Sequence, residues 1–161
     1  MLYVILYLLF VLPFKGRDRL ETAEAINTIA KERNMNNEAL KAWVFLLAQE
    51  SAFDTDAINK NSGALGIGQV MPQYVKYFQS KIKDTSADPM SLYGGLRMSA
   101  WVFKDCYNRF PSVQGAWACY YSGANHACTK AVHNNDFTKQ CPNTYKHVRR
   151  IFKNYNRWLS N

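Results

Sequence analysis

The stretch Gln49-Glu50-Ser51-Ala52-Phe53, followed at positions 63–72 by Gly-Ala-Leu-Gly-Ile-Gly-Gln-Val-Met-Pro, decides how this chain folds. It places one carboxylate, Glu50, at the end of a strongly apolar run. The three glycines that follow predict a compact turn, in which the backbone can approach another segment closely because glycine has no side chain. A polar residue, Gln69, comes directly after this turn.

The residues before Glu50 predict a helix from about 37 to 51. Its apolar residues lie almost all round the helix, so we expect it to be central and buried. Asn36 can cap the start of this helix, and Glu38 lies in the first turn, where the helix dipole favours an acid. At the opposite end, burial and the dipole both favour the protonated form of Glu50, which suits a general acid acting on a glycosidic bond.

The rest of the chain also predicts helices and no strand. Apolar residues recur at helical spacing over four further segments, at about 19–33, 91–110, 113–121 and 145–159. Pro72 is expected to open another helix, which runs to about 83. Pro111 is expected to stop the helix predicted at about 91–110. Residues 53–62, 84–89 and 122–143 are interpreted as loops. The fold class we predict is mainly α, with a single domain over residues 17–161.

Composition indicates a globular protein. The chain has 161 residues, 48% of them apolar and 20% charged, with a formal net charge of +8. The charge is uneven, because residues 106–161 hold eight Lys or Arg against one acid. Such a basic segment could face nucleic acid, an anionic membrane or an acidic wall polymer, or could simply be a solvated surface. No nucleic-acid-binding signature accompanies it, so we expect no nucleic acid partner.

Residues 1–16 are interpreted as an export signal or a short membrane anchor. No charge interrupts the run from Leu2 to Phe14, and Lys15, Arg17 and Arg19 follow it. The run is shorter than the roughly 20 residues that span a bilayer. It also lacks a preceding basic residue and a small-x-small cleavage site. The alternative is a buried N-terminal helix. Export to the periplasm or cell envelope is the localisation that we predict.

Four cysteines, Cys106, Cys119, Cys128 and Cys141, all lie in the C-terminal third. An even count in an exported chain makes disulfides plausible, and three pairings are possible. We favour Cys128 with Cys141, because the polar segment between them has few apolar residues to hold it. The alternatives are four buried thiols, or a zinc site with His126 and His133. The cysteine and histidine spacing fits none of the usual zinc patterns, so no metal is expected.

The motifs resemble those of the lytic transglycosylases of the soluble-transglycosylase, goose-lysozyme-like superfamily. The first block reads Glu50-Ser51-Ala52-Phe53, then Ala57, Gly63-Ala64-Leu65-Gly66 and Gln69-Val70-Met71-Pro72. Weaker matches are Asp88-Pro89 with Gly94-Gly95, Cys119-Tyr120-Tyr121-Ser122-Gly123, and Tyr145 with Val148. The resemblance covers about 21–155. It implies a lysozyme-like fold and peptidoglycan glycan strands as substrate, with no cofactor.

By this resemblance Glu50 is the catalytic acid and base. Substrate-binding roles fall on Ser51, which would also orient Glu50, and on Gln69, Met71, Tyr120 and Tyr121. Tyr121 departs from the family, which commonly has an asparagine there. Gly68 replaces a larger apolar residue and Cys119 a small one.

A lone carboxylate suits a non-hydrolytic cleavage. An ordinary glycosidase uses two carboxylates, and the nearest to Glu50 are Asp54 and Asp56, which we expect to be solvated and structural. The resemblance implies cleavage between N-acetylmuramic acid and N-acetylglucosamine with an internal anhydro ring. The alternatives are a hydrolytic muramidase of the same fold and a catalytically weak wall-binding module.

Besides the glycan strands, the partner suggested by analogy with similar folds is a secretion, conjugation or phage assembly. The apolar N-terminal segment could contact the membrane. The aromatic residues Tyr74, Tyr77 and Phe78 are expected to be mostly core, with stacking on sugar rings as the alternative.

Overall fold

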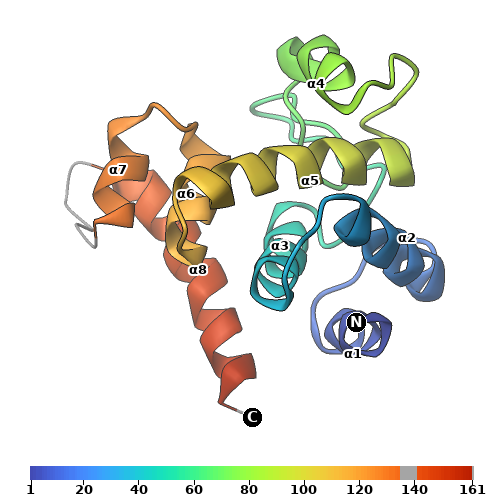
Figure 1. Cartoon of the computed structure of the whole chain (residues 1–161), viewed down its shortest axis with the longest axis horizontal. Coiled ribbons are helices and arrows are strands. Elements are labelled where there is room, and N and C mark those ends of the chain that lie inside the picture. Colours follow the sequence, from blue (N-terminus) through green and yellow to red (C-terminus); the bar gives the residue numbers. More distant parts are fainter. Residues whose placement is uncertain (135–140, 161) are drawn as a thin grey trace. The chain divides into compact units, whose positions relative to one another are not determined.

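The computed structural model of the chain describes residues 1–134 and 141–160 (Figure 1). These residues form eight α-helices and one 3₁₀ helix. The extended pairing among them is limited to isolated bridges, of Ile58 with Leu65 and of Leu65 with Val70. The mainly α prediction is therefore confirmed. The chain divides into two compact units, Met1–Trp101 and Val102–Asn161.

The first unit holds the helices that come before and after the Glu50 block. They are α1 (Leu2–Val11), α2 (Arg19–Glu32), α3 (Asn37–Glu50), η1 (Pro72–Tyr74), α4 (Val75–Ile82) and the first part of α5 (Leu92–Arg109). The bounds of α2, α3 and α5 lie within a residue or two of the predicted helices. Pro72 opens a short 3₁₀ turn rather than α4 itself, which begins three residues later.

Helix α3 is the buried helix that the sequence predicts. The Asn36 side chain accepts a hydrogen bond from the Ala39 N–H at 2.8 Å, which caps the helix start. Eight consecutive or near-consecutive positions are buried: Ala39, Leu40, Ala42, Trp43, Val44, Phe45, Leu46 and Leu47. The Trp43 indole N–H donates to the Ser99 hydroxyl at 3.0 Å inside this core. The helix is thus a rigid support for the residues at its C-terminal end.

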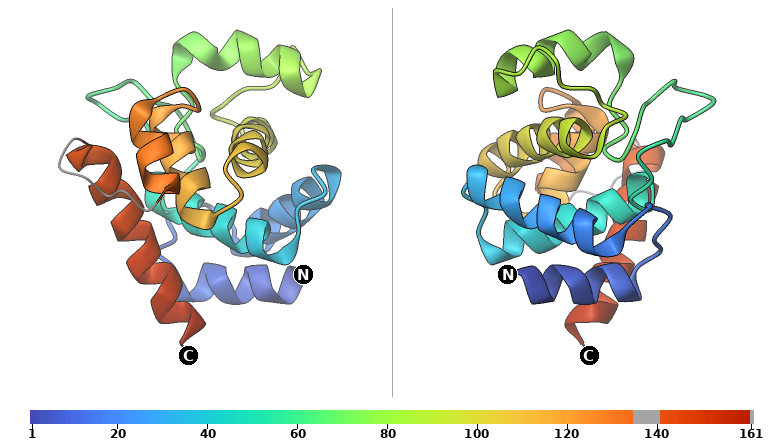
Figure 2. Two further views of the ribbon diagram at one scale, coloured as in Figure 1. Left: turned by 60° about the vertical axis from the view of Figure 1, so that its left-hand side comes forward. Right: turned by 90° about the vertical axis from the view of Figure 1, so that its right-hand side faces the viewer.

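Helix α1 packs against α2 and α3 (Figures 1 and 2). Its inner face buries Ile5, Leu8 and Leu9 completely, while Tyr3 and Phe10 are exposed on the other side. In the described part of the chain, no helix combines the length and apolar character needed to cross a bilayer. The interpretation of residues 1–16 as an export signal or anchor stays a prediction, because the packing of α1 on the domain does not test it.

The turn after the Glu50 loop depends on Gly66. This residue has φ +67°, and a Cβ placed on it would collide with the main-chain carbonyl oxygen of Pro89. A Cβ on Gly95 would lie 2.6 Å from the same oxygen. The glycines of the first and second motif blocks therefore bring three backbone segments into contact. This is the close backbone approach that the glycine spacing predicts.

The second unit contains the end of α5, α6 (Val113–Ser122), α7 (Ala127–His133) and α8 (Pro142–Leu159). Helix α8 is amphipathic as predicted, with Val148, Ile151 and Tyr155 buried and the basic residues exposed. It begins three residues before the predicted start, because Pro142 is favourable in a first helical turn.

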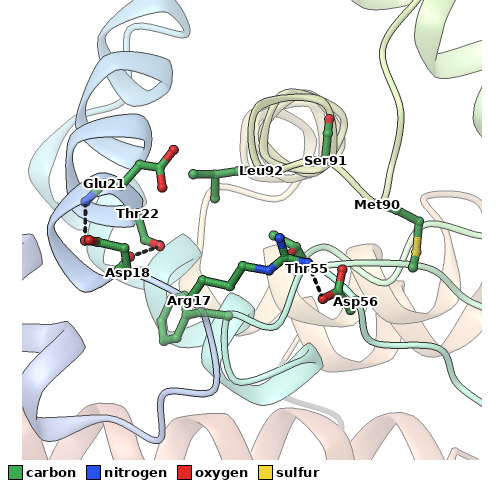
Figure 3. Close-up of a pocket in the computed structure, with 10 residues that line it drawn as sticks. Arg17, Asp18, Glu21, Thr22, Thr55, Asp56, Met90, Ser91 and Leu92 are labelled. Carbon is green, nitrogen blue, oxygen red and sulfur yellow. Dashed lines mark hydrogen bonds and ion pairs between the residues drawn. The ribbon is translucent and has the colours of Figure 1, made fainter.

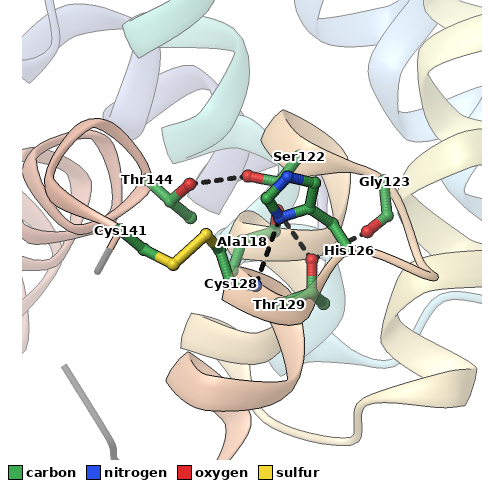
Figure 4. Close-up of a disulfide and its surroundings, with 8 residues drawn as sticks. All are labelled: Ala118, Ser122, Gly123, His126, Cys128, Thr129, Cys141 and Thr144. Atoms are coloured by element: carbon green, nitrogen blue, oxygen red, sulfur yellow. Dashed lines mark hydrogen bonds between the residues drawn. A yellow bond between two sulfur atoms is a disulfide. The ribbon is translucent and has the colours of Figure 1, made fainter. Parts of the chain in front are cut away.

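Helix α7 corrects the prediction of a loop over 122–143. The His126 ring nitrogen accepts from the Cys128 N–H at 3.1 Å, and Thr129 Oγ1 donates to the Gly123 carbonyl at 2.8 Å (Figure 4). These local bonds start a short helix. It has few apolar residues, so the sequence shows no helical spacing there. Residues 135–140 of the predicted loop lie outside the described residues.

Both cysteine pairs form disulfides in the second unit, Cys106–Cys119 and Cys128–Cys141. Figure 4 shows the second one joining α7 to the start of α8. The favoured pairing of Cys128 with Cys141 is confirmed, and the alternative of four free thiols is wrong. Each bridge closes a short loop, with a sequence separation of 13.

We predict that Gly66→Ala destabilises the protein much more than Gly63→Ala. Gly63 has φ +74° but open space around its Cα, so alanine there costs only the left-handed conformation, about 1 kcal/mol. At Gly66 the collision with Pro89 adds to this cost, so the free energy of unfolding should fall by about 3 kcal/mol or more. Urea unfolding of both variants measures the difference, and equal losses would contradict the packing described.

We also predict that the double substitution Cys128→Ala, Cys141→Ala lowers the free energy of unfolding by about 3 kcal/mol, because a short closed loop no longer restricts the unfolded chain. Urea unfolding of the full-length protein, followed by tryptophan fluorescence, measures it. The wild type in dithiothreitol should lose more, since both bridges are then open. No change in either experiment would contradict a stabilising role.

Candidate functional site

Glu50 is the last residue of α3, and the chain reverses directly after it. Ala52 and Phe53 both adopt left-handed backbone angles, with φ +54° and +65°. Non-glycine residues rarely do so, and each costs of the order of 1–3 kcal/mol. Two adjacent residues of this kind beside a half-buried carboxylate indicate a functional site, since strained backbone persists where the surrounding structure holds it.

Glu50 lies on the wall of a hollow of about 380 Å³ within the first unit. Polar side chains from four different segments line the same hollow: Lys15, Gln49, Ser51, Asp54, Asn59 and Gln69. The apolar support comes from the buried part of α3 beneath it. A partly buried carboxylate on an open, polar hollow is suited to proton transfer to a bound polar ligand.

Ser51 ties the end of α3 to the glycine turn. Its hydroxyl donates to the main-chain carbonyl of Ile67 at 2.9 Å. The residue next to Glu50 is thus fixed to the turn that carries Gly66. The orienting effect of Ser51 on Glu50 and its direct contact with substrate stay predictions.

Gln69 faces the same hollow as Glu50. Its side-chain amide donates to the carbonyls of Gly66 at 3.0 Å and Ala57 at 3.5 Å, and its own φ is +50°. The amide nitrogen therefore closes the turn, and the residue is fixed in place beside Glu50. Met71 is half-buried and precedes η1, but it is not among the described residues that line the hollow.

Tyr120 and Tyr121 lie on α6, in the second unit. Tyr120 is half-buried. The Tyr121 ring is 48% exposed and stacks on the His147 ring of α8, with centroids 4.4 Å apart. The ring that replaces the expected asparagine is therefore engaged by its own unit. Contacts of both tyrosines with a glycan stay predictions.

Three polar members of the hollow carry no functional signal in the sequence, and the environment of a fourth differs from the expectation. Lys15 lies in the segment interpreted as a leader, while Gln49 and Asn59 match no predicted site position. Asp54, which we expect to be solvated, is half-buried and lines the hollow with Glu50. One Asp54 carboxylate oxygen accepts from the Asp56 N–H at 2.9 Å. This bond fits the structural role predicted for Asp54. The position of Asp54 nevertheless places a second carboxylate in the hollow, beside Glu50.

Asp56 lies in a different place from Asp54. Its carboxylate pairs with the Arg17 guanidinium at 2.8 Å, beside a smaller hollow of about 200 Å³ that is bordered by the starts of α2 and α5 (Figure 3). The two side chains are 59% and 81% exposed, so the pair itself contributes little to stability. Its importance is geometric, because it connects the N-terminal segment to the loop after Glu50.

The aromatic residues near Pro72 divide into core and surface. Phe78 packs against the small core of Val70, Ala87 and Met98. Tyr74 and Tyr77 are about half exposed, and Tyr77 meets the Trp101 ring edge-on at 6.0 Å. The expectation of core therefore holds for Phe78, while Tyr74 and Tyr77 keep a free surface on which a sugar ring could stack.

A comparison with known protein families identifies a family for this chain. The family model described as the transglycosylase SLT domain matches residues 26–141, which is well over half of the chain. The matched region contains Glu50, the glycine turn, Gln69 and both tyrosines of α6. No curated protein and no solved structure matches the chain. The helical architecture of the described residues agrees with the lysozyme-like fold of this family.

Proposed function

Because the chain belongs to the family of transglycosylase SLT domains, we propose that it is a peptidoglycan lytic transglycosylase. It cleaves the β-1,4 bond between N-acetylmuramic acid and N-acetylglucosamine and leaves an anhydromuramoyl end. Family membership supports a transglycosylase-type function on peptidoglycan in general. The observation that carries the finer proposal is Glu50, half-buried beside a polar hollow at the end of a buried helix.

In the proposed reaction Glu50 acts twice. Its carboxyl group first donates a proton to the glycosidic oxygen, and the bond from that oxygen to the muramoyl C1 breaks. The resulting carboxylate then takes the proton of the muramoyl C6 hydroxyl, whose oxygen bonds to C1. Glu50 thus regains its proton, and no water is consumed. General acid–base catalysis of this kind contributes ~100- to 10,000-fold.

Asp54 supports the alternative reaction. A muramidase needs a second carboxylate that attacks C1 or activates a water, and Asp54 lines the same hollow. Against this alternative, one of its oxygens already accepts the Asp56 N–H, as a carboxylate that holds a turn does. Transglycosylation therefore remains the better supported reaction.

We predict that Glu50→Gln abolishes the clearing of purified sacculi, with a loss of at least about 100-fold, while Asp54→Asn keeps most of the activity. The amide in Asp54→Asn can still accept the Asp56 N–H, so the loop is preserved. Turbidity measurements on both variants, with circular dichroism as the folding control, make the test. Full clearing by Glu50→Gln would reject Glu50 as the catalytic acid, and a loss of clearing in both variants would favour a muramidase. A wild type that binds sacculi without clearing them would favour a wall-binding module.

The fragments released by the wild type give a second prediction. Mass spectrometry should find muramoyl ends that are one water lighter than reducing ends. Reducing ends in their place would overturn transglycosylation and leave the hydrolytic muramidase.

We further propose that the protein works in the cell envelope, exported and held there by its N-terminal segment. Two disulfides support this, because such bonds persist in oxidising compartments. The uncharged run from Leu2 to Phe14 supports it as well. A secretion, conjugation or phage assembly that must pass the wall would be the natural partner of such an enzyme, by analogy alone.

A further inference from the structure

Residues Phe14–Arg17 lie against the loop that follows Glu50. The Lys15 N–H donates to the carbonyl oxygen of Ala52 at 2.7 Å, one of the shortest main-chain bonds outside the helices of the described residues. Ala52 is the first residue of the strained reversal. An N-terminal segment therefore binds the main chain two residues after the proposed catalytic acid.

Two side-chain contacts continue this attachment. The Phe14 ring stacks on the Phe53 ring with centroids 5.6 Å apart and an interplanar angle of 27°. Phe53 is fully buried, although it stands in the left-handed region. The guanidinium of Arg19, at the start of α2, lies 4.6 Å from the Phe14 ring centroid. Phe14 thus contacts both α2 and the strained residue.

The fit leaves no space for a larger residue at position 16. A Cβ on Gly16 would lie 2.8 Å from the Phe53 carbonyl oxygen and 2.7 Å from the Phe14 ring. The Arg17–Asp56 ion pair then attaches the segment to a second point of the same loop (Figure 3). Four successive residues therefore contact Ala52, Phe53 and Asp56.

We propose that Phe14–Arg17 is a positioning element of the active site. Two adjacent left-handed residues cost free energy, and they persist only where surrounding contacts outweigh that cost. For Ala52 and Phe53, the segment supplies a hydrogen bond, a ring stack and a close backbone contact. Its attachment keeps the end of α3 in one geometry and so fixes the direction in which Glu50 presents its carboxyl group.

The inference rests on the proposed function of Glu50, and it bears on the N-terminal segment. If residues 1–16 were removed as an export signal, the Phe14 stack and the Lys15 bond would be lost. A cleavage compatible with full activity would therefore lie before Phe14, or the segment is retained as an anchor.

The test compares Phe14→Ala with Phe10→Ala in the full-length protein. Phe10 is the matched control, because Arg19 also lies over its ring, at 5.6 Å, but it is 71% exposed and on α1. Phe14→Tyr keeps the ring and should restore the function. We expect kcat on soluble glycan chains to fall about 10- to 100-fold in Phe14→Ala with KM little changed, since a small misplacement of a catalytic group has effects of this size.

Amide hydrogen exchange gives a readout that does not need activity. The N–H groups of Ala52 and Asp54, which bond to Ala48 and Ser51, should exchange faster in Phe14→Ala than in Phe10→Ala, while those within α3 stay protected. Gly16→Ala, which changes the contact without removing a ring, should give the same pattern.

Equal kcat and equal exchange in Phe14→Ala and Phe10→Ala would overturn the proposal. So would a kcat loss that Phe14→Tyr fails to restore, or a fall in protection throughout α3, which would indicate general destabilisation. An inactive wild type would instead reject the proposed function, and the exchange pattern would still report whether the segment holds the loop.

Discussion

The reversal of the chain at Ala52 and Phe53 is the constraint on which the site depends. A buried helix ends at Glu50, and the backbone turns through two left-handed residues that would be unfavourable in isolation. Three contacts, from the glycine turn and from the N-terminal segment, hold this reversal. The Ser51 hydroxyl binds the glycine turn, Phe14 stacks on Phe53, and the Lys15 N–H binds Ala52. Glu50 therefore faces a polar hollow from a fixed helix end.

The glycine turn links this reversal to the rest of the first unit. Gly66 packs on the carbonyl of Pro89, and Gly95 packs on the same group. Motif residues that are far apart in the sequence are thus parts of one packing arrangement. The chemical groups of the motif, Glu50 and Gln69, are carried on that arrangement, which explains why glycines accompany them.

Much of this arrangement could be predicted from sequence. The buried period of α3, the Asn36 cap and the Gly66 turn are local signals with direct physical causes. Helix α7 could not be predicted, because side-chain caps and a disulfide stabilise it rather than an apolar period. Nor could Lys15 and Asp54 be placed at the hollow. Lys15 lies in an N-terminal segment whose sequence resembles a leader, and Asp54 lies in a polar loop without a periodic pattern.

In the proposed reaction a single carboxylate, Glu50, cleaves the glycan without water. Digestion of purified sacculi in water enriched in heavy oxygen is the sharpest test of this reaction. Mass spectrometry of the released fragments should find no heavy oxygen at the new muramoyl ends, because the C6 hydroxyl supplies the bond to C1. One heavy oxygen for each cleaved bond, incorporated during cleavage, would contradict it.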